Sequence, residues 1–132
     1  MCDNYPDEDR INFLVSRHWY KEEYNQINQL LNKFVPNTHI VAPFSSHIQI
    51  DLDNCLLFNP LVQSVKHIQM KTSHCHDNCV TLFKNKIIEL IYTGYALSVD
   101  GLWRFHSWGM DKQYNLIETT ESRLLYWGIA IG

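Results

Sequence analysis

The sequence contains no long apolar run, no basic stripe and no repeat, and each absence excludes a class of protein. None of its hydrophobic stretches approaches the roughly eighteen residues that a membrane-spanning helix needs. The 11 Lys and Arg residues are scattered among 14 Asp and Glu residues, so a net charge of -3 provides no positive field for nucleic acid. Internal repeats, low-complexity tracts and Ser/Gly linkers are also lacking. We therefore expect neither a membrane nor a nucleic acid as partner.

What is present is typical of one globular domain. The 132 residues, of which 45% are hydrophobic and 19% charged, suffice for a single core without metals or disulfides, so we expect one domain over residues 1–132. The acidic start M-C-D-N-Y-P-D-E-D-R is unlike a signal peptide. This predicts a cytoplasmic protein, or an effector secreted without a standard signal, and the four cysteines are then expected to be free thiols.

The first half of the chain has mixed signals. Apolar residues at three- and four-residue steps predict one long amphipathic helix over residues 11–34, which ends before Pro36. Residues 38–42 and 47–52 have the alternating or β-branched character of short strands. Asn59 followed by Pro60 is a typical helix start, and it predicts a short helix that runs to about Ile68.

The second half begins with a helix and continues as strands. A helix is expected to start near Ser73 or His74 and to end at Lys84 or Lys86, which places Cys75 in its first turn. From Ile87 onward, apolar segments alternate with turn signals at Asp100-Gly101 and at residues 111–114, and this pattern predicts an antiparallel meander. The expected fold class is α+β, with N-terminal helices packed on an antiparallel β-meander.

Cys75 is the candidate nucleophile. A thiol attacks a carbonyl carbon as the thiolate, and a helix N-terminus lowers the pKa of a thiol through its positive potential and free backbone N–H groups. The same N–H groups can hold a developing oxyanion, and Gln69, six residues earlier, is a candidate side-chain donor to it. Cys75 is thus expected in the environment that a catalytic cysteine requires.

The candidate base and orienter are His106 and Glu118. His106 is the one histidine of the strand-rich half, and a hairpin centred near Lys112 would place it directly across from Glu118. Residues directly across from each other on neighbouring strands are about 5 Å apart, so the carboxylate can hold the orientation and the tautomer of the imidazole ring. Trp108 shares the face of His106 and is expected to cover the site and bind substrate there, whereas Trp103 and Phe105 point the other way, into the core. Tyr126 is expected in the core or at the rim.

A cysteine at a helix start, H-S-W on a strand and E-T-T on the next strand resemble the core of the transglutaminase-like branch of papain-like thiol enzymes. The resemblance covers residues 69–120. It implies Cys75 as nucleophile, His106 as base, Glu118 as orienter and a papain-like core. The chain departs from the pattern because its acid is Glu and no tryptophan follows Cys75, which leaves reaction type and substrate open. Residues 95–128 also resemble a small bacterial family of uncharacterised proteins, which implies no activity.

Three alternatives remain beside the thiol site. Five residues with soft or imidazole ligands lie close together in the sequence and form a candidate zinc or copper site: His67, His74, Cys75, His76 and Cys79. Cys75 and Cys79 are also a candidate redox pair, although their spacing is not the usual dithiol motif. A third alternative is a binding or accessory module of the same fold without turnover, whose contact surface is the strand that carries Trp103, Phe105 and Trp108.

Taken together, the sequence predicts a cysteine-dependent hydrolase or acyl-transferase of the protease, amidase or deamidase type. Its substrate would be a protein or peptide-like amide, and neither cofactor nor metal is expected in this reading. Arg104, next to the candidate base, either binds a substrate carboxylate or pairs with Asp100 or Glu118 at the surface.

Overall fold

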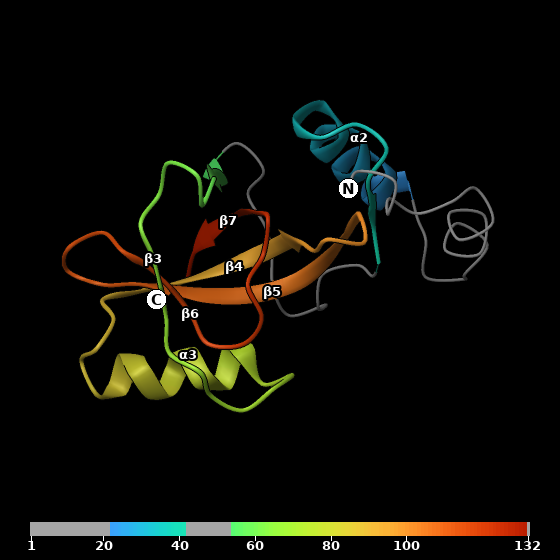
Figure 1. The fold of residues 1–132 in the computed structure, drawn as a ribbon. Coiled ribbons are helices and arrows are strands. Elements are labelled where there is room, and N and C mark those ends of the chain that lie inside the picture. Colours follow the sequence, from blue (N-terminus) through green and yellow to red (C-terminus); the bar gives the residue numbers. More distant parts are fainter. Residues whose placement is uncertain (1–21, 42–53, 132) are drawn as a thin grey trace.

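A computed structural model describes residues 22–41 and 54–131 of the chain, and these form two helices and one curled, mixed sheet (Figure 1). The sheet order is β2-β7-β4-β5-β6-β3, and β1 pairs in addition with β5. This arrangement agrees with the predicted α+β class. The helices are α2 (Glu22–Phe34) and α3 (Cys75–Lys84); the strands are β1 (His39–Ile40), β2 (Leu56–Phe58), β3 (Val65–His67), β4 (Leu90–Leu97), β5 (Leu102–Met110), β6 (Leu116–Glu118) and β7 (Leu125–Ala130).

β5 is the longest strand of the described chain, and two strands share one of its edges. Near its start, β1 runs parallel to it and pairs at Leu102 and Trp103. Near its end, β6 runs antiparallel to it and pairs at Gly109 and Met110. Along its other edge, β4 pairs with it without interruption. Within the described residues, the middle of β5, residues 104–108, therefore has a strand neighbour on one side alone.

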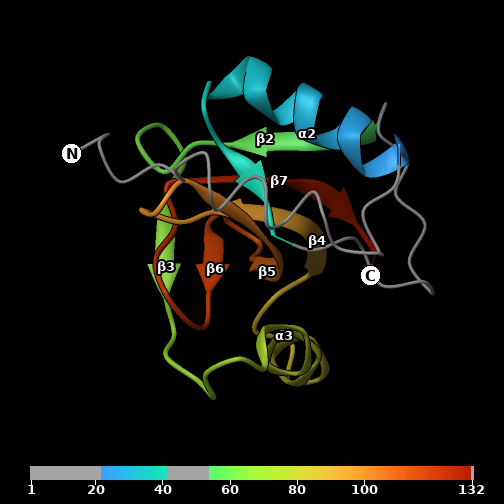
Figure 2. The same cartoon turned by 90° about the vertical axis from the view of Figure 1, so that its right-hand side faces the viewer.

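The two faces of β4 and β5 bury different clusters, because side chains alternate along a strand. On one face, Tyr95, Leu97 and Trp103 pack with α2 through Ile27 and Leu31. Farther along the sheet, α3 covers a cluster that includes Ile88 and Ile91 (Figure 2). On the other face, the buried residues are mostly aromatic: Phe58, Tyr92, Ala96, Trp108, Met110, Leu116 and Tyr126. The sheet thus separates an aromatic interior from two helix-covered clusters.

Side-chain hydrogen bonds hold α2 and β1 on the sheet. The backbone N–H of Ile40 donates to Asn28 Oδ1 at 3.0 Å, and the indole N–H of Trp103 donates to Thr38 Oγ1 at 2.9 Å. Residues 22–34 of the predicted long helix are confirmed as helical, whereas its first part and the strand predicted at residues 47–52 lie outside the described residues. The strand predicted at residues 38–42 is seen at His39–Ile40.

The helix predicted from Asn59 to Ile68 is wrong. Asn59 does cap a turn, since its Oδ1 accepts the N–H of Leu61 at 3.0 Å, but the turn does not propagate. Leu61 and Val62 are 90% and 87% exposed, so the apolar stripe of such a helix finds no packing partner. The chain instead forms β3, which runs parallel to β6 and pairs Val65 with Leu116.

The C-terminal strands are antiparallel as predicted, but they are not a simple meander. The Asp100-Gly101 hairpin is confirmed: Gly101 has φ 82 and closes the turn between β4 and β5. β7, however, does not pair with β6. It crosses back and pairs antiparallel with β4, because β3 occupies the outer edge of β6. The connection begins beside the loop before α3, where Thr119 accepts the N–H of Met70, and it ends beside β4, where the N–H of Leu124 donates to the carbonyl of Leu97.

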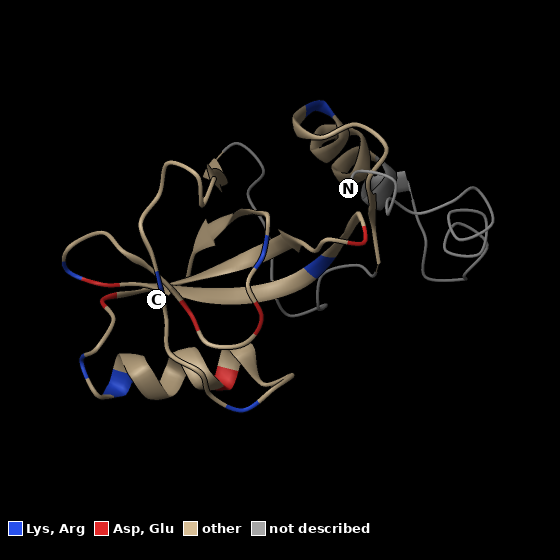
Figure 3. Ribbon diagram, in the orientation of Figure 1, with Lys and Arg blue, Asp and Glu red and all other residues tan. Residues whose placement is uncertain are grey.

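Charged residues of both signs are interspersed along the described ribbon, without a continuous run of one sign (Figure 3). No helix in the described part of the chain has the length and apolar character needed to cross a membrane.

Candidate active site

Cys75 is the first residue of α3 and so lies in its first turn, as the sequence predicts, although the helix starts one or two residues later than expected. The residue before it, His74, occupies the N-cap position but makes no capping hydrogen bond with its side chain; its Nδ1 lies 2.9 Å from the carbonyl of Thr72. Ser73 has a positive φ of 65, an uncommon conformation for a residue with a side chain. The first N–H groups of a helix have no partner within it, and at the start of α3 the backbone N–H of His76 is directed to the Cys75 sulfur.

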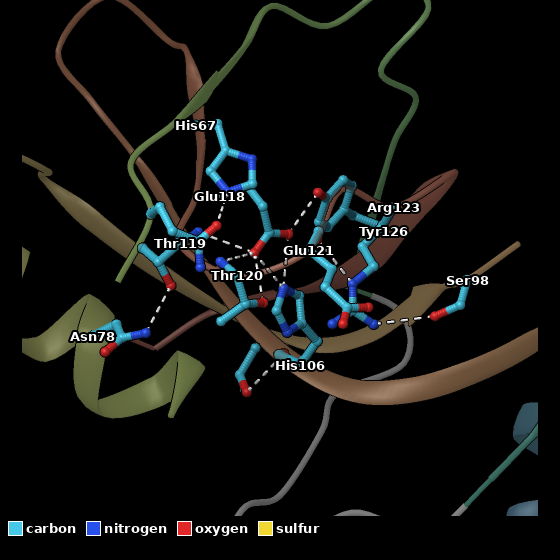
Figure 4. Close-up of polar contacts among 12 residues, drawn as sticks. His67, Asn78, Ser98, His106, Glu118, Thr119, Thr120, Glu121, Arg123 and Tyr126 are labelled. Carbon is cyan, nitrogen blue, oxygen red and sulfur yellow. Dashed lines mark hydrogen bonds and ion pairs between the residues drawn. The ribbon is translucent and has the colours of Figure 1, made fainter. Parts of the chain in front are cut away.

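α3 is fastened to the sheet so that its N-terminus reaches the middle of β5. Asn78 is buried, and its Nδ2 donates to the carbonyl of Lys71 at 2.8 Å and to Thr119 Oγ1 at 3.2 Å (Figure 4). Cys79 and Leu82 are buried against the sheet. The helix start therefore lies beside the stretch of β5 that has a strand neighbour on one side alone, and Cys75 faces that edge.

His106 and Glu118 form a buried pair. His106 Nε2 lies 2.9 Å from Glu118 Oε1 and 3.0 Å from Oε2, and the two residues are 1% and 0% exposed (Figure 4). Since Nε2 is directed to the carboxylate, it carries the ring proton of the neutral imidazole, and Nδ1 is the nitrogen that is left to accept a proton. The pair therefore fixes the tautomer that a general base needs.

Four further hydrogen bonds hold the Glu118 carboxylate. Its Oε2 accepts the backbone N–H groups of Thr119 and Thr120, both at 3.0 Å, and the Thr120 hydroxyl at 3.1 Å. Its Oε1 accepts the hydroxyl of Tyr126 at 2.7 Å. Burial would raise the pKa of Glu118, but the hydrogen bond and charge of His106 together with these donors lower the pKa to about 2. Glu118 is therefore a carboxylate at neutral pH.

The predicted register between β5 and β6, which paired His106 with Glu118, is wrong: the turn between the two strands is centred one residue later than expected. Gly109 pairs with Ile117, and one further step along this register places Trp108 across from Glu118. His106 is then a diagonal neighbour of Glu118 on the same face, still within reach of a long side chain. The prediction placed both residues on one face correctly, because side chains alternate with a period of two.

Cys75 and His106 perturb each other electrostatically. Burial would raise the pKa of the Cys75 thiol, yet the hydrogen bond and charge of His106 and the backbone N–H groups of Ser107 and His76 bring it below its ordinary value. Burial would lower the pKa of His106, but its contacts with Cys75 and Glu118 raise it. The two shifts favour a thiolate beside an imidazolium.

Aromatic rings cover the side of His106 that faces the interior. The indole of Trp108 stacks on His106 with ring centroids 6.1 Å apart, and Tyr126 lies at 6.2 Å. Trp108 is fully buried and lies on the predicted face, but it does not line the cavity beside Cys75. Its arrangement fits exclusion of water from the pair better than contact with a substrate.

A cavity of about 300 Å³ opens beside the thiol. Its walls come from the loop before α3, from β5 and from the loop between β6 and β7: Thr72, Ser73, Cys75, Phe105, His106, Thr120, Glu121 and Arg123. Gln69 is not among them, because its Nε2 donates to the carbonyl of Met70 at 3.0 Å and its Oε1 lies 2.9 Å from His67 Nε2. The structure brings Cys75, His106 and Glu118 together and leaves Gln69 apart.

The other candidate residues lie elsewhere. Arg104 forms a bidentate ion pair with Asp100 at 3.0 and 2.7 Å, which is the surface alternative of the sequence analysis. Trp103 and Trp108 are both fully buried, so they do not form the exposed contact surface of the binding-module alternative. Phe105 points to the predicted side but is only half buried, at the wall of the cavity.

The metal and redox alternatives gain no support from the geometry. Among the described residues, no three His, Cys, Asp or Glu side chains converge as ligands would. Cys75 and Cys79 are free thiols. Cys79 is buried in the cluster under α3, and burial, with the charges of Cys75 and Glu118, raises its pKa to about 12. It is therefore a poor partner for thiol exchange.

Sequence reasoning assigned no role at the site to Tyr126 or Thr120. Tyr126 was expected in the core or at the rim, and it is indeed buried, but its hydroxyl binds Glu118. Thr120 belongs to the E-T-T motif, and its backbone N–H and its hydroxyl both donate to Glu118. A polar group on an otherwise apolar strand was the available signal for Tyr126.

No family model matches the chain, and neither a curated protein nor a solved structure is significantly similar to it.

Proposed function

We propose that the protein is a cysteine-dependent hydrolase or acyl-transferase that acts on a protein or peptide-like amide. The observation that carries the proposal is the buried His106–Glu118 pair, whose second ring nitrogen is left for the thiol of Cys75 at the wall of a cavity. Desolvation offsets much of the attraction within a buried charged pair, so such a pair is weak evidence for a purely structural role, and groups with perturbed pKa values concentrate at functional sites.

The reaction follows from the arrangement. His106 Nδ1 takes the thiol proton, and the Cys75 sulfur attacks the amide carbonyl to give a tetrahedral oxyanion. Backbone N–H groups at the start of α3 are the candidate donors to that oxyanion. The imidazolium then gives its proton to the leaving nitrogen, and a thioester remains. Water or an amine, deprotonated by His106, attacks the thioester and releases the Cys75 thiolate. Attack by water gives hydrolysis, and attack by an amine gives acyl transfer.

The test is the rate at which iodoacetamide labels Cys75, followed by peptide mass spectrometry across a pH series. Because His106 favours the thiolate, we expect labelling to persist well below the pH at which an ordinary thiol becomes reactive. His106→Gln should move the profile to higher pH and slow labelling at pH 6.5 by about tenfold or more.

His76→Gln is the matched control, because His76 neighbours Cys75 on α3 and its ring contacts Ser107 instead. This variant should keep the profile of the wild type. Labelling of Cys75 no faster than an ordinary thiol, or a profile unchanged in His106→Gln, would contradict the proposal and favour a non-catalytic binding module of the same fold.

A further inference from the structure

Besides Cys75 and His106, the wall of the cavity carries two charged residues, and both come from the loop between β6 and β7. Glu121 is exposed, whereas Arg123 is half buried. Either residue could select a substrate by its charge: Glu121 would select a cationic group and Arg123 an anionic one. The surroundings of the two side chains decide between them.

Arg123 is held in place by two hydrogen bonds that involve no carboxylate. Its Nε donates to the backbone carbonyl of Glu121 at 3.1 Å, and its Nη1 donates to Ser98 Oγ at 3.2 Å (Figure 4). Neither bond uses Nη2. Within the described part of the chain, no carboxylate lies within ion-pair distance of this guanidinium. Arg123 is thus a positioned cation whose charge has no ion-pair partner there.

The neighbouring arginine provides a direct contrast. Arg104 lies on β5, and Asp100 neutralises it through two hydrogen bonds. These bonds, and after them the charges of Asp100 and Glu121, raise the pKa of Arg104. Arg104 therefore already has an acidic partner in Asp100, whereas Arg123 remains as a donor at the cavity wall.

We propose that Arg123 binds an anionic group of the substrate, so that the acyl donor carries a carboxylate close to the carbonyl that Cys75 attacks. This inference rests on the proposed function and names its substrate class: amides next to an acidic side chain or a terminal carboxylate. A guanidinium binds carboxylates in a planar, two-bond geometry, and Arg123 is already oriented by Ser98 and by the backbone, so little ordering is required on binding.

The test uses reagents that place a carboxylate at graded distances from the reacting carbon. Iodoacetyl-glycine and iodoacetyl-β-alanine are compared with their uncharged carboxamides, and the second-order rate of Cys75 labelling is measured for each. The ratio of the anionic to the neutral rate reports recognition of the carboxylate, and the neutral rate by itself reports the thiolate. In the wild type we expect a ratio of about ten for the better-fitting length.

Arg123→Gln should lower that ratio several-fold, and because each ratio is taken against the neutral reagent on the same variant, any change in thiolate reactivity cancels. Arg104→Gln is the matched control, and it should retain the ratio because Asp100 already neutralises Arg104. Ser98→Ala removes one anchor of Arg123 but keeps its charge, and we expect it to lower the ratio by a smaller factor. This milder variant decides the matter if Arg123→Gln does not fold.

An equal ratio in the wild type and in Arg123→Gln would overturn the inference. So would preferential labelling by an iodoacetyl-amine that is lost in Glu121→Gln, since the site would then select cations. Failure of the proposed function has a different signature, because it is a slow neutral rate in the wild type, whatever the ratio.

Discussion

Glu118 accepts hydrogen bonds from His106 Nε2 at 2.9 Å and from the Tyr126 hydroxyl at 2.7 Å on the same oxygen, Oε1. All three side chains are buried. A buried carboxylate is stable in such a place because its oxygens accept hydrogen bonds from several donors. It also fixes the imidazole through Nε2, so that Nδ1 is directed to Cys75. The site is therefore organised from the carboxylate outward.

The depressed pKa of Glu118 predicts a specific loss of stability in acid. Because its pKa falls from 4.5 to about 2 on folding, its stabilising contribution is present above pH 4.5 and is lost as the pH falls toward 2. A shift of this size corresponds to about 3 kcal/mol. The raised pKa of His106 adds a contribution that is complete below pH 6.5 and declines above it. We expect the pair to stabilise the fold most between these values.

Denaturant unfolding measured across this pH range checks the prediction. Glu118→Gln should lower the free energy of unfolding at pH 5.5 and flatten its decline in acid. Glu121→Gln is the control, because its side chain is exposed and it should leave the curve unchanged. An equally steep acid decline in Glu118→Gln would show that other carboxylates carry it.

Tyr126→Phe removes one donor from a buried carboxylate. A hydrogen bond to a charged group contributes about 1.5 to 3 kcal/mol, so we expect a loss of that size in unfolding free energy. The rate of Cys75 labelling near neutral pH should fall modestly, because Glu118 keeps its bonds to His106, Thr119 and Thr120. Tyr114→Phe is the control, since Tyr114 is 78% exposed. Equal stability of the two variants would argue against the Tyr126 bond.

The sequence sufficed for those parts of the site that depend on local signals. The start of α3 at Cys75 follows from the helix pattern and its lysine-bearing end. The shared face of His106 and Glu118 follows from the two-residue period of strands, which any shift of the turn centre by a whole residue preserves. The turn itself is centred one residue later than expected, because Asp111 Oδ1 accepts the N–H groups of Gln113 and Asn115.

Features that depend on distant partners were not predictable. β3 forms because its backbone pairs with β6, about fifty residues later in the sequence. The local cap at Asn59 predicted a helix instead. Gln69 lies close to Cys75 in sequence, yet the chain between them turns its amide toward His67. Likewise, Tyr126 reaches Glu118 because β7 crosses back to β4, a connection that no short pattern encodes.

Cys79 provides an internal reference for the reactivity of Cys75. It is 0% exposed, and burial raises its pKa to about 12, so it should stay unlabelled by iodoacetamide in the native protein at neutral pH. Cys79→Ala should leave the labelling profile of Cys75 unchanged, whereas Cys79→Ser buries a hydroxyl and should cost about 1 to 3 kcal/mol. Rapid native labelling of Cys79 would mean that α3 opens readily and that the site is not rigid.

Gly94 is a position where the central sheet has no room for a side chain. It pairs with His106 on β5 and with Gly128 on β7. A Cβ at Gly94 would lie 2.1 Å from the carbonyl oxygen of Trp127 and 2.5 Å from the Cα of Gly128. Both are backbone atoms, so β7, which carries Tyr126, would have to move away from β4.

Gly94→Ala should therefore lower the free energy of unfolding by about 3 kcal/mol. In the fraction that stays folded, it should also slow the labelling of Cys75. Gly109→Ala is the comparison, because the three atoms nearest to its Cβ would all belong to the side chain of Ile88, the closest at 2.7 Å, and a side chain moves at lower cost than a strand. Thermal unfolding of the two variants decides the matter. If Gly109→Ala were the more damaging, packing of α3 rather than the close approach of β4 and β7 would set the geometry of the site.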